Sequence, residues 1–438
     1  MQLRYNFRLD PQPGQQEALA RAFGCARVVY NDALALRRRM RVQGMEQLSD
    51  TELQRQVITL AKRTEGRAWL AEAPSVVLTQ SLRDLSAGFS AFFASRSGKR
   101  KGAAVGEPRF RSRKDHRQSI RFTRDGFRLR DNKTLYLAKI GEVAVRWSRQ
   151  LPSQPSTVTV VKDSAGRYFA SFVVETDADG DARRFTEPSG VVGIDLGLSM
   201  FATLSDGTVV DNPKLLRQAE RRLRKAQQSV SRKQKGSNNR AKAVRRLAKV
   251  HANVAAARSD FHHKLSTSII RDNQAVIVED LAVKGLARSM LAKSVQDAGW
   301  GRFLRMLEYK AERYGRELVR VDRFFPSSQI CSECGHLDGP KPLDVRVWVC
   351  SACGATLERD LNAARNIQSE GMRILVAAGR AETRNACGAW RRPESVPAPR
   401  REAGTHRGAG APRPAQQEAP ALGLERTPKI SWPHDGRA

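Results

Sequence analysis

Long hydrophobic segments are missing from this chain of 438 residues. No apolar run reaches the length of a transmembrane helix. The first residues, MQLRYNFRLDP, lack the apolar core of a secretory signal peptide. These absences argue against a helical membrane protein and a secreted one. We therefore expect a cytoplasmic protein with no membrane partner.

Cysteine is scarce, with six residues, and the motifs of several enzyme classes are absent. The sequence has neither a Ser-His-Asp set nor a phosphate-binding Walker loop. Four of the cysteines are clustered, whereas Cys25 and Cys387 stand alone. This distribution is not the disulfide framework of a short secreted chain. We interpret Cys25 as a small buried side chain and Cys387 as incidental.

Acidic residues are outnumbered, with 45 Asp and Glu against 77 Lys and Arg and a formal charge of +32. Such an excess predicts a polyanionic partner, and nucleic acid is the leading candidate because neutralising phosphates releases counterions. The alternative is a basic protein that associates with ribosomes or aggregates.

The spacing of apolar residues divides the first half of the chain into strands and helices. Residues 1–10 alternate like a strand, and residues 15–96 carry the spacing of amphipathic helices. From 119 to 175, short alternating runs are separated by turn residues, which predicts a small antiparallel barrel or sheet. The first strand could join that sheet, so that the helices form an insertion. Residues 176–190 are interpreted as a linker.

After residue 191 the pattern predicts three strands, long helices, a further strand and a helix. From residue 376 the periodicity is lost, and the segment is rich in Pro, Gly and Arg. Such a composition buries too little apolar surface to offset the entropy of ordering. We therefore expect a disordered basic tail at 376–438.

Two segments concentrate positive charge. Residues 97–118 hold eight Lys or Arg with glycines that predict an irregular loop, and residues 214–249 hold fourteen with one acid in a predicted helical hairpin. Like charges at this density repel one another unless a polyanion neutralises them; a solvated face is the alternative. The candidate nucleic-acid contacts in them are Arg109, Arg111, Arg113, Lys114, Arg221, Arg222, Arg224 and Lys225.

The stretch GVVGIDLGLSMFATLSDGTVV places an acid in an apolar strand. Residues 191–194 predict a buried strand, so the Asp195 carboxylate has to be paired or to hold a metal. Gly193 and Gly197 beside it allow another backbone or a phosphate to come close. An acid in the first strand of a meander is typical of RNase H-like nucleases. Actin-like ATPases open similarly, and a structural Asp is the other alternative.

A second apolar strand, at 275–278, ends in two acids, Glu279 and Asp280. Carboxylates at strand ends meet at one rim of a sheet, which makes Glu279 a candidate metal ligand. The alternative is an exposed Glu279. In that alternative Asp280 caps the next helix, a role that is also compatible with Glu279 as a ligand.

Two C-x-x-C pairs, fifteen residues apart, are formed by Cys331, Cys334, Cys350 and Cys353. This spacing predicts a zinc ribbon whose four thiolates close a structural tetrahedral site, with an iron–sulfur centre as the alternative. Val345, Val347 and Val349 alternate and predict a β hairpin between the pairs.

Seven residues after the last cysteine, Asp360 opens the helical segment RDLNAARNI. A plain helix N-cap is the alternative for this residue alone. Together, Asp195, Glu279 and Asp360 would supply the shared carboxylates that two Mg²⁺ ions need for phosphodiester hydrolysis. We therefore predict these three acids as catalytic residues and magnesium ligands. The adjacent His262 and His263 are expected to pack or to contact phosphate.

The motifs GIDLG, IVEDL, CSECG, CSACG and RDLNAARNI occur in the order found in TnpB proteins, and FGCARVVYNDAL and PRFRSR also resemble this family. TnpB proteins are transposon-encoded, RNA-guided DNA endonucleases related to type V CRISPR effectors. The resemblance spans about residues 1–375. It implies a multidomain α+β protein in which a β-barrel wedge domain with an inserted helical module precedes an RNase H-like (RuvC) α/β nuclease with a zinc-ribbon insertion.

The implied domains are a wedge domain at 1–14 and 97–186, a helical recognition module at 15–96, a RuvC-like nuclease domain at 187–326 and 358–375, a zinc ribbon at 327–357 and the tail at 376–438. The resemblance further implies a guide noncoding RNA from the transposon end and double-stranded target DNA as partners. One monomer per RNA in the cytoplasm or nucleoid of a prokaryote is expected. A motif beside the target would be read near Thr79, Gln80 and Thr123.

Three alternatives stay open at this point. An RNase H-like transposase also uses three acids, a nuclease-inactive RNA-guided DNA-binding protein would share the architecture, and a plain zinc-ribbon nucleic-acid-binding protein would explain the charge. The third does not account for Asp195 and Glu279. The second would be expected to lack one or more of the three acids, and all are present.

Overall fold

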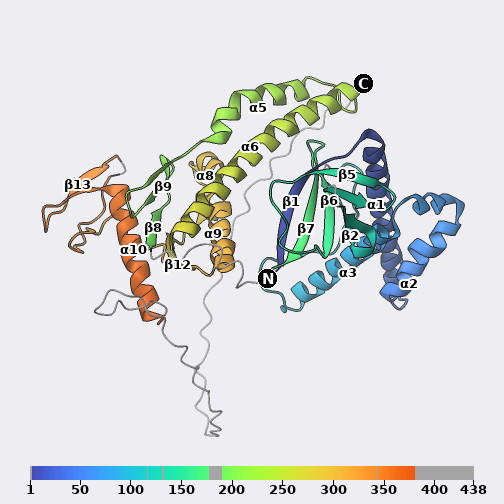
Figure 1. Ribbon diagram of the computed structural model, residues 1–438, viewed down its shortest axis with the longest axis horizontal. Helices are drawn as coiled ribbons and strands as arrows, with labels where there is room; N and C mark the ends of the chain where they lie inside the picture. The colour runs from blue at the N-terminus through green and yellow to red at the C-terminus, as the bar shows by residue number, and fades with distance from the viewer. Residues whose placement is uncertain (1, 116, 131–132, 177–189, 343, 380–438) are drawn as a thin grey trace, which may run out of the picture. The chain divides into compact units, whose positions relative to one another are not determined.

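The computed structural model describes residues 2–115, 117–130, 133–176, 190–342 and 344–379 (Figure 1). Most of the predicted linker at 176–190 and of the predicted tail at 376–438 lies outside these residues. No helix in the described ranges combines the length and the apolar character needed to cross a membrane.

The first strand, β1 (Gln2–Asp10), lies in the middle of a seven-stranded antiparallel sheet with the order β2-β6-β7-β1-β5-β4-β3. It pairs with β7 from Gln2 opposite Glu175 to Leu9 opposite Tyr168. This pairing confirms that the first strand joins the sheet. The other strands are β2 (Gln118–Thr123), β3 (Phe127–Leu129), β4 (Thr134–Leu137), β5 (Gly141–Arg146), β6 (Thr157–Lys162) and β7 (Tyr168–Glu175).

The sheet curls around one hydrophobic core. Strands β2 and β3 lie at opposite ends of the strand order, yet only the turn η4 (Arg124–Gly126) separates them in the chain. Phe122 of β2 and Phe127 of β3 are buried in the same cluster as Phe7 of β1. This shared core is what a barrel-like sheet requires.

The helical segment between β1 and β2 packs partly on this sheet and partly on itself. It comprises α1 (Pro13–Val42), α2 (Asp50–Gln54), η1 (Arg55–Leu60), η2 (Ala61–Arg63), η3 (Glu65–Glu72) and α3 (Ser75–Arg96). In α1, Leu19 and Phe23 belong to the core of the sheet, whereas Val29 and Leu34 pack in a second core with Leu78 of α3. The single long helix α1 therefore connects two cores.

The second half of the chain contains a five-stranded mixed sheet with the order β10-β9-β8-β11-β12. Its strands are β8 (Val191–Asp195), β9 (Met200–Leu204), β10 (Val209–Asp211), β11 (Ala275–Glu279) and β12 (Glu317–Val321). Strands β8, β9 and β10 form the predicted meander, and β11 runs parallel to both β8 and β12. The parallel pairing brings the carboxyl ends of β8 and β11 to one edge.

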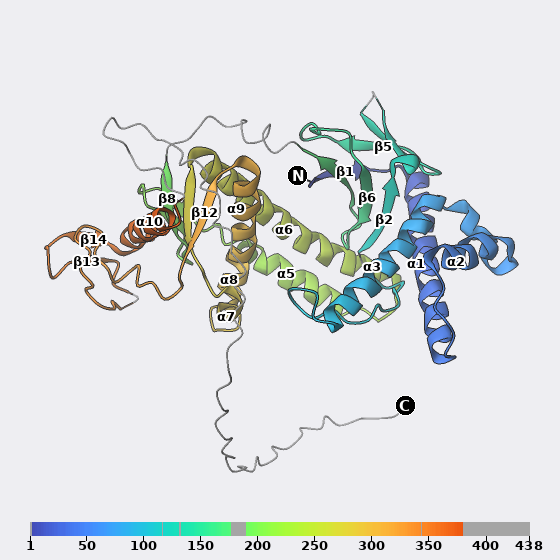
Figure 2. The same cartoon turned by 90° about the horizontal axis from the view of Figure 1, so that it is seen from below.

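Helices cover both faces of this sheet. They are α5 (Leu215–Ser231), α6 (Asn238–Asp272), α7 (Val283–Leu286), α8 (Ala292–Ala298), α9 (Trp300–Tyr314) and α10 (Arg359–Ala377). Val276 and Val278 of β11 pack in a cluster with residues of α6 and α9, whereas Ile277 packs in a cluster with Ile367 of α10. Figures 1 and 2 show α6 and α9 on one side of the strands and α10 on the other.

Two glycines let α10 approach the sheet. A Cβ at Gly193 of β8 would lie 2.2 Å from the carbonyl oxygen of Ala364 and 2.6 Å from the amide nitrogen of Gln368. At Gly371 of α10, a Cβ would lie 2.2 Å from Ile277. Contacts this short are impossible for a side chain, so both positions require glycine. The prediction that Gly193 admits another backbone is confirmed, and that backbone belongs to α10.

The zinc-ribbon segment differs from its prediction in the position of its hairpin. Strand β13 (Val347–Val349) pairs with β14 (Thr356–Glu358), so the ladder encloses the second cysteine pair instead of lying between the two pairs. The side chain of Trp348 is buried at 5% exposure, whereas Val347 and Val349 are 59% and 60% exposed. The predicted position of the hairpin is therefore wrong, and the Trp between the two valines packs against Cys331 and Cys350.

Candidate active site and zinc centre

The three predicted acids come from two adjacent parallel strands and one helix start. Asp195 is the last residue of β8, and Glu279 is the last residue of β11. Asp360 is the second residue of α10, which crosses the sheet over Gly193. The N-cap of α10 is Glu358, so the N-cap alternative for Asp360 is wrong. A carboxylate in the first turn is still favoured by the helix dipole.

Electrostatics couples these acids. Burial foremost, followed by the nearby Glu279 and Asp360 carboxylates, raises the pKa of Asp195 to about 7. Burial also raises the pKa of Glu279, although a hydrogen bond from Ser327 opposes the shift. Crowded, desolvated carboxylates of this kind are stabilised by a bound cation.

The carboxylate of Asp280 has different hydrogen-bond partners from that of its neighbour Glu279. The helix α7 has Ala282 as its N-cap, so the prediction that Asp280 caps the next helix is wrong. Its carboxylate instead accepts hydrogen bonds from Arg320, at 3.3 Å, and from Arg323. These bonds to the arginines, with Arg323 foremost, lower the pKa of Asp280.

The four cysteines converge on one point. The sulfur atoms of Cys331 and Cys353 lie 3.7 Å apart, as do those of Cys334 and Cys350. A tetrahedral zinc with Zn–S bonds near 2.3 Å sets the sulfurs about 3.8 Å apart, so these thiols fit zinc. Hydrogen bonds, foremost that from the backbone N–H of Cys353, together lower the pKa of the Cys350 thiol to about 7, which favours the thiolate.

The two cysteine pairs lie in two backbone turns of the same kind. The N–H of Gly335 donates to the carbonyl of Cys331 at 2.9 Å, and the N–H of Gly354 donates to the carbonyl of Cys350 at 2.9 Å. Both glycines have left-handed φ angles, of 78° and 73°. The four sulfur atoms all lie within 4.8 Å of one another, close enough to hold one metal ion.

A chain of buried polar groups connects the four-cysteine site with Glu279 at the acidic edge. The Ser327 hydroxyl donates to Glu279 at 2.6 Å, and the Ser327 carbonyl accepts from the Asn366 side chain at 2.8 Å. Asn362 donates to the carbonyl of Ile330 at 2.8 Å and accepts from the N–H of Ser332, beside Cys331, at 2.8 Å. Sequence analysis missed these residues. The only signal is the pair of Asn residues at i and i+4 on the apolar face of RDLNAARNI.

Arg346 was also missed, and it reaches Asp360 from the segment between the two cysteine pairs. One nitrogen of its guanidinium lies 3.5 Å from the Asp360 carboxylate, and another lies 3.4 Å from the Ser199 hydroxyl. No periodicity distinguishes Arg346 from the other arginines of the chain.

The predicted nucleic-acid contacts of the first basic segment separate into two kinds. Arg109, Arg113 and Lys114 are exposed. Arg111 instead stacks over the Tyr30 ring at 3.9 Å and forms an ion pair with Asp84 at 3.3 Å. Its guanidinium thereby anchors the segment to the helices. Thr123 ends β2 and is half-buried.

The second basic segment forms the predicted helical hairpin, α5 and α6, with the second helix extending to Asp272. The basic residues named for α5 are all exposed: Arg221, Arg222, Arg224 and Lys225. On α6, His262 is fully buried and contacts the carbonyl of Ala298 at 2.9 Å, so it packs as expected.

Comparison with known proteins places this architecture in a family. The family OrfB_IS605, described as "Probable transposase", matches residues 171–290. A "Cas12f1-like, TNB domain" matches residues 300–367. A "Helix-turn-helix domain" matches residues 1–45, although here those residues form one strand and one continuous helix.

Individual relatives agree with these matches, two of them over most of their length. A "Putative RNA-guided DNA endonuclease" of Streptomyces pristinaespiralis is 46% identical over 84% of this chain and 89% of its own length. The "Putative RNA-guided DNA endonuclease InsQ" of Escherichia coli is 32% identical over 85% of this chain and 92% of its own length. "TnpB-like protein L79" of Acanthamoeba polyphaga mimivirus is 26% identical over 52% of this chain and 45% of its own length. The chain belongs to the TnpB family.

Proposed function

We propose that this chain is an RNA-guided, metal-dependent DNA endonuclease with a RuvC-like active site. The observation that carries the proposal is the meeting of Asp195, Glu279 and Asp360 at one sheet edge, where the latter two raise the pKa of the first. The relatives that match most of the chain carry the name RNA-guided DNA endonuclease. The meander followed by two parallel strands supports an RNase H-like nuclease domain.

Magnesium fits the acidic edge, because hard cations bind carboxylate oxygens and three are present. Bound in a pair, Mg²⁺ ions would activate a water and stabilise the leaving oxygen of a phosphodiester. The role of this chain is to fix the ligands. Strand ends hold Asp195 and Glu279, Ser327 orients Glu279, and α10 holds Asp360.

Guide RNA and target DNA are the proposed partners, with the RNA supplying sequence choice by base pairing. The formal charge of +32 and the exposed arginines of α5 support a polyanionic partner. In this proposal the RNA comes from the transposon end, and one monomer binds one RNA.

The experiment is to express the chain with its flanking DNA, sequence the co-purifying RNA and assay cleavage of a matching plasmid library. Glu279→Gln and Asp280→Asn form a matched pair of variants. We expect Glu279→Gln to abolish cleavage and Asp280→Asn to retain it, because Asp280 is bound to Arg320 and Arg323. Equal activity of the two variants would refute the assignment of Glu279.

A transposase is the second candidate, since the family that matches residues 171–290 is described in that way. It would join DNA ends without RNA. Integration of a labelled transposon end by RNA-free protein would favour it over the guided nuclease.

A further inference from the structure

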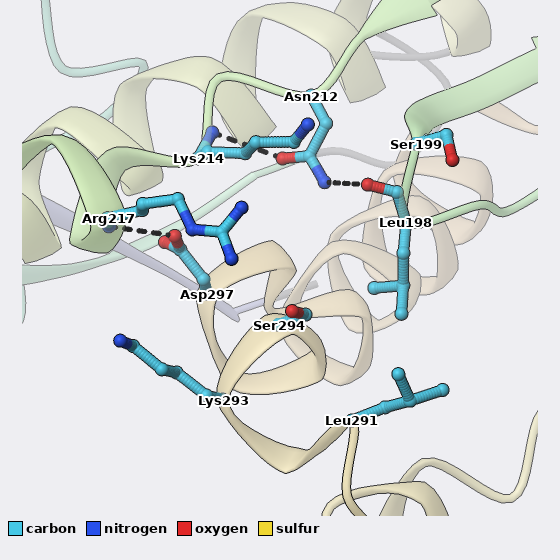
Figure 3. Close-up of a pocket in the computed structure, with 9 residues that line it drawn as sticks. All are labelled: Leu198, Ser199, Asn212, Lys214, Arg217, Leu291, Lys293, Ser294 and Asp297. Atoms are coloured by element: carbon cyan, nitrogen blue, oxygen red, sulfur yellow. Dashed lines mark hydrogen bonds between the residues drawn. The ribbon is translucent and has the colours of Figure 1, made fainter.

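A cavity of about 210 Å³ opens between the turn after β8, the start of α5 and the helix α8 (Figure 3). The nucleolytic role proposed above does not use it. It is lined by Leu198, Ser199, Asn212, Lys214, Arg217, Leu291, Lys293, Ser294 and Asp297.

The cavity adjoins the acidic edge. Ser199 lines it and lies four residues after Asp195. The guanidinium of Arg346 contacts the Ser199 hydroxyl with one nitrogen and the Asp360 carboxylate with another, at 3.4 Å and 3.5 Å. A single guanidinium therefore contacts both Asp360 and Ser199, a residue of the cavity wall.

The walls differ in character. In Figure 3, the side chains of Leu198 and Leu291 lie on one side, and those of Lys214 and Arg217 lie on the other. The Asn212 amide donates to the carbonyl of Leu198 at 2.9 Å, which ties the apolar wall to the cationic one. An apolar surface opposite two cations matches a nucleotide, which has a base or sugar at one end and a phosphate at the other.

Two of the cations are available for a ligand. Lys293 is engaged by Glu220 at 2.8 Å. The Asp297 carboxylate is saturated by the N–H groups of Leu216 and Arg217, at 2.8 Å and 3.1 Å, and by Arg258 at 3.2 Å.

In the described part of the chain, neither the Lys214 ammonium nor the Arg217 guanidinium forms an ion pair. Because the first N–H groups of α5 bind Asp297, an anion in the cavity would be held by these two side chains.

The backbone at Lys214 is strained. This residue has a φ of 45° and a ψ of 46°, the left-handed region that costs a non-glycine residue about 1 kcal/mol or more. The Asn212 side chain accepts the Lys214 N–H at 3.2 Å and holds it there. A strained residue that persists beside a candidate site is consistent with a functional position.

We propose that this cavity binds one nucleotide of the DNA strand being cut, next to the scissile phosphate. Lys214 and Arg217 hold its phosphate, and Leu198 and Leu291 contact its base or sugar. The proposal rests on the nuclease function proposed above and adds a substrate subsite to it. Binding there fixes the register of the strand over Asp195, Glu279 and Asp360.

The first test is kinetic. The double variant Lys214→Gln/Arg217→Gln is loaded with guide RNA and compared with Lys264→Gln/Arg373→Gln, which removes the same charge from exposed ion pairs of α6 and α10. Because a misplaced substrate loses rate, we expect the first variant to cleave about tenfold to a hundredfold more slowly, with unchanged RNA loading and target binding. The control should match the wild type. Equal rates for both double variants would overturn the proposal.

A second variant guards against a folding defect. Ser294→Phe fills the cavity without a change of charge and is expected to slow cleavage at an unchanged melting temperature. A rate equal to that of the wild type would contradict occupation of the cavity.

The occupant is identified by crosslinking, which needs no cleavage. Asp195→Ala complexes are assembled with 4-thiothymidine at single positions of the target DNA, or with 4-thiouridine in the guide RNA. We expect DNA crosslinks to peptides that contain Leu198 or Leu291. Crosslinks from the RNA alone, or none from the DNA, would refute the proposal. A wild-type complex that does not cleave would instead disprove the nuclease function itself.

Discussion

The hydroxyl of Ser327 donates a hydrogen bond of 2.6 Å to the carboxylate of Glu279. Ser327 is only 8% exposed, and its own carbonyl is held by Asn366 of α10. One side chain thus orients a proposed metal ligand, and the helix that carries Asp360 fixes that side chain in turn.

Replacement of Ser327 by Ala is expected to lower cleavage about tenfold to a hundredfold, because residues that orient a ligand affect metal affinity to this extent. The Mg²⁺ concentration for half-maximal cleavage should rise, which a general loss of stability would not cause. Ser327→Thr keeps the hydroxyl and should recover most of the activity. An unchanged magnesium dependence in Ser327→Ala would show that the hydrogen bond does not orient the ligand.

Loss of one zinc thiolate is expected to destabilise the nuclease half of the chain, because metal binding is coupled to folding. Cys334→Ser should contain less than one zinc per chain and melt at a lower temperature. Cys25→Ala, in the separate core of α1 and α3, should keep its zinc. Metal analysis with thermal melting checks both variants. Full activity and an unchanged melting temperature after chelation of zinc would contradict this coupling.

Gly193→Ala is expected to displace α10, since a Cβ there would lie 2.2 Å from the carbonyl oxygen of Ala364. Overpacking of this kind costs about 1–3 kcal/mol, and the displacement should also move Asp360. Gly14→Ala is the control, because its Cβ would meet no atom within 4 Å. Thermal melting and cleavage rates measure both effects. Equal behaviour of the two variants would mean that α10 does not rely on this close approach.

A buried histidine should make stability depend on pH. Burial lowers the pKa of His262 to about 4, from an ordinary value of 6.5. The folded chain therefore excludes a proton that the unfolded chain binds, so the contribution of His262 to stability is complete above pH 6.5 and is lost as the pH falls towards 4. By pH 5 the loss amounts to about 2 kcal/mol.

The wild type should have a higher free energy of unfolding than His262→Phe at pH 7.5. This difference should become smaller as the pH falls to 5. His251→Phe, at an exposed position of the same helix, is the control. Denaturant titrations at both pH values measure the difference. A constant gap between wild type and His262→Phe would contradict the buried, neutral state of His262.

Local patterns predicted much of the fold and of the candidate site. Burial makes a strand apolar along its length, so the strands that end in Asp195 and Glu279 could be predicted from the sequence. Tetrahedral coordination requires closely spaced ligands, so the zinc ribbon could be predicted from the cysteine spacing. The alternation of Val345, Val347 and Val349 gave the wrong hairpin, because period two indicates a strand without identifying its partner, and Val347–Val349 pairs with Thr356–Glu358 around the second cysteine pair.

Long-range contacts explain what the sequence did not reveal. Ser327 lies 48 residues from Glu279, and Arg346 lies 147 residues from Ser199. Arg111 resembles its exposed neighbours in sequence, and only the fold places Tyr30 and Asp84 against it. Similarly, Asp280 is a residue type that often caps helices, but the fold places Arg320 of β12 and the following Arg323 beside its carboxylate.

The central claim is that Asp195, Glu279 and Asp360 form one RNA-guided cutting site. The most direct measurement is single-turnover cleavage of a DNA target that matches the bound guide, by wild-type and Asp195→Ala complexes with equal RNA content. The account predicts cleavage by the wild type and none by Asp195→Ala, with RNA binding preserved. Cleavage by Asp195→Ala at the wild-type rate would contradict it.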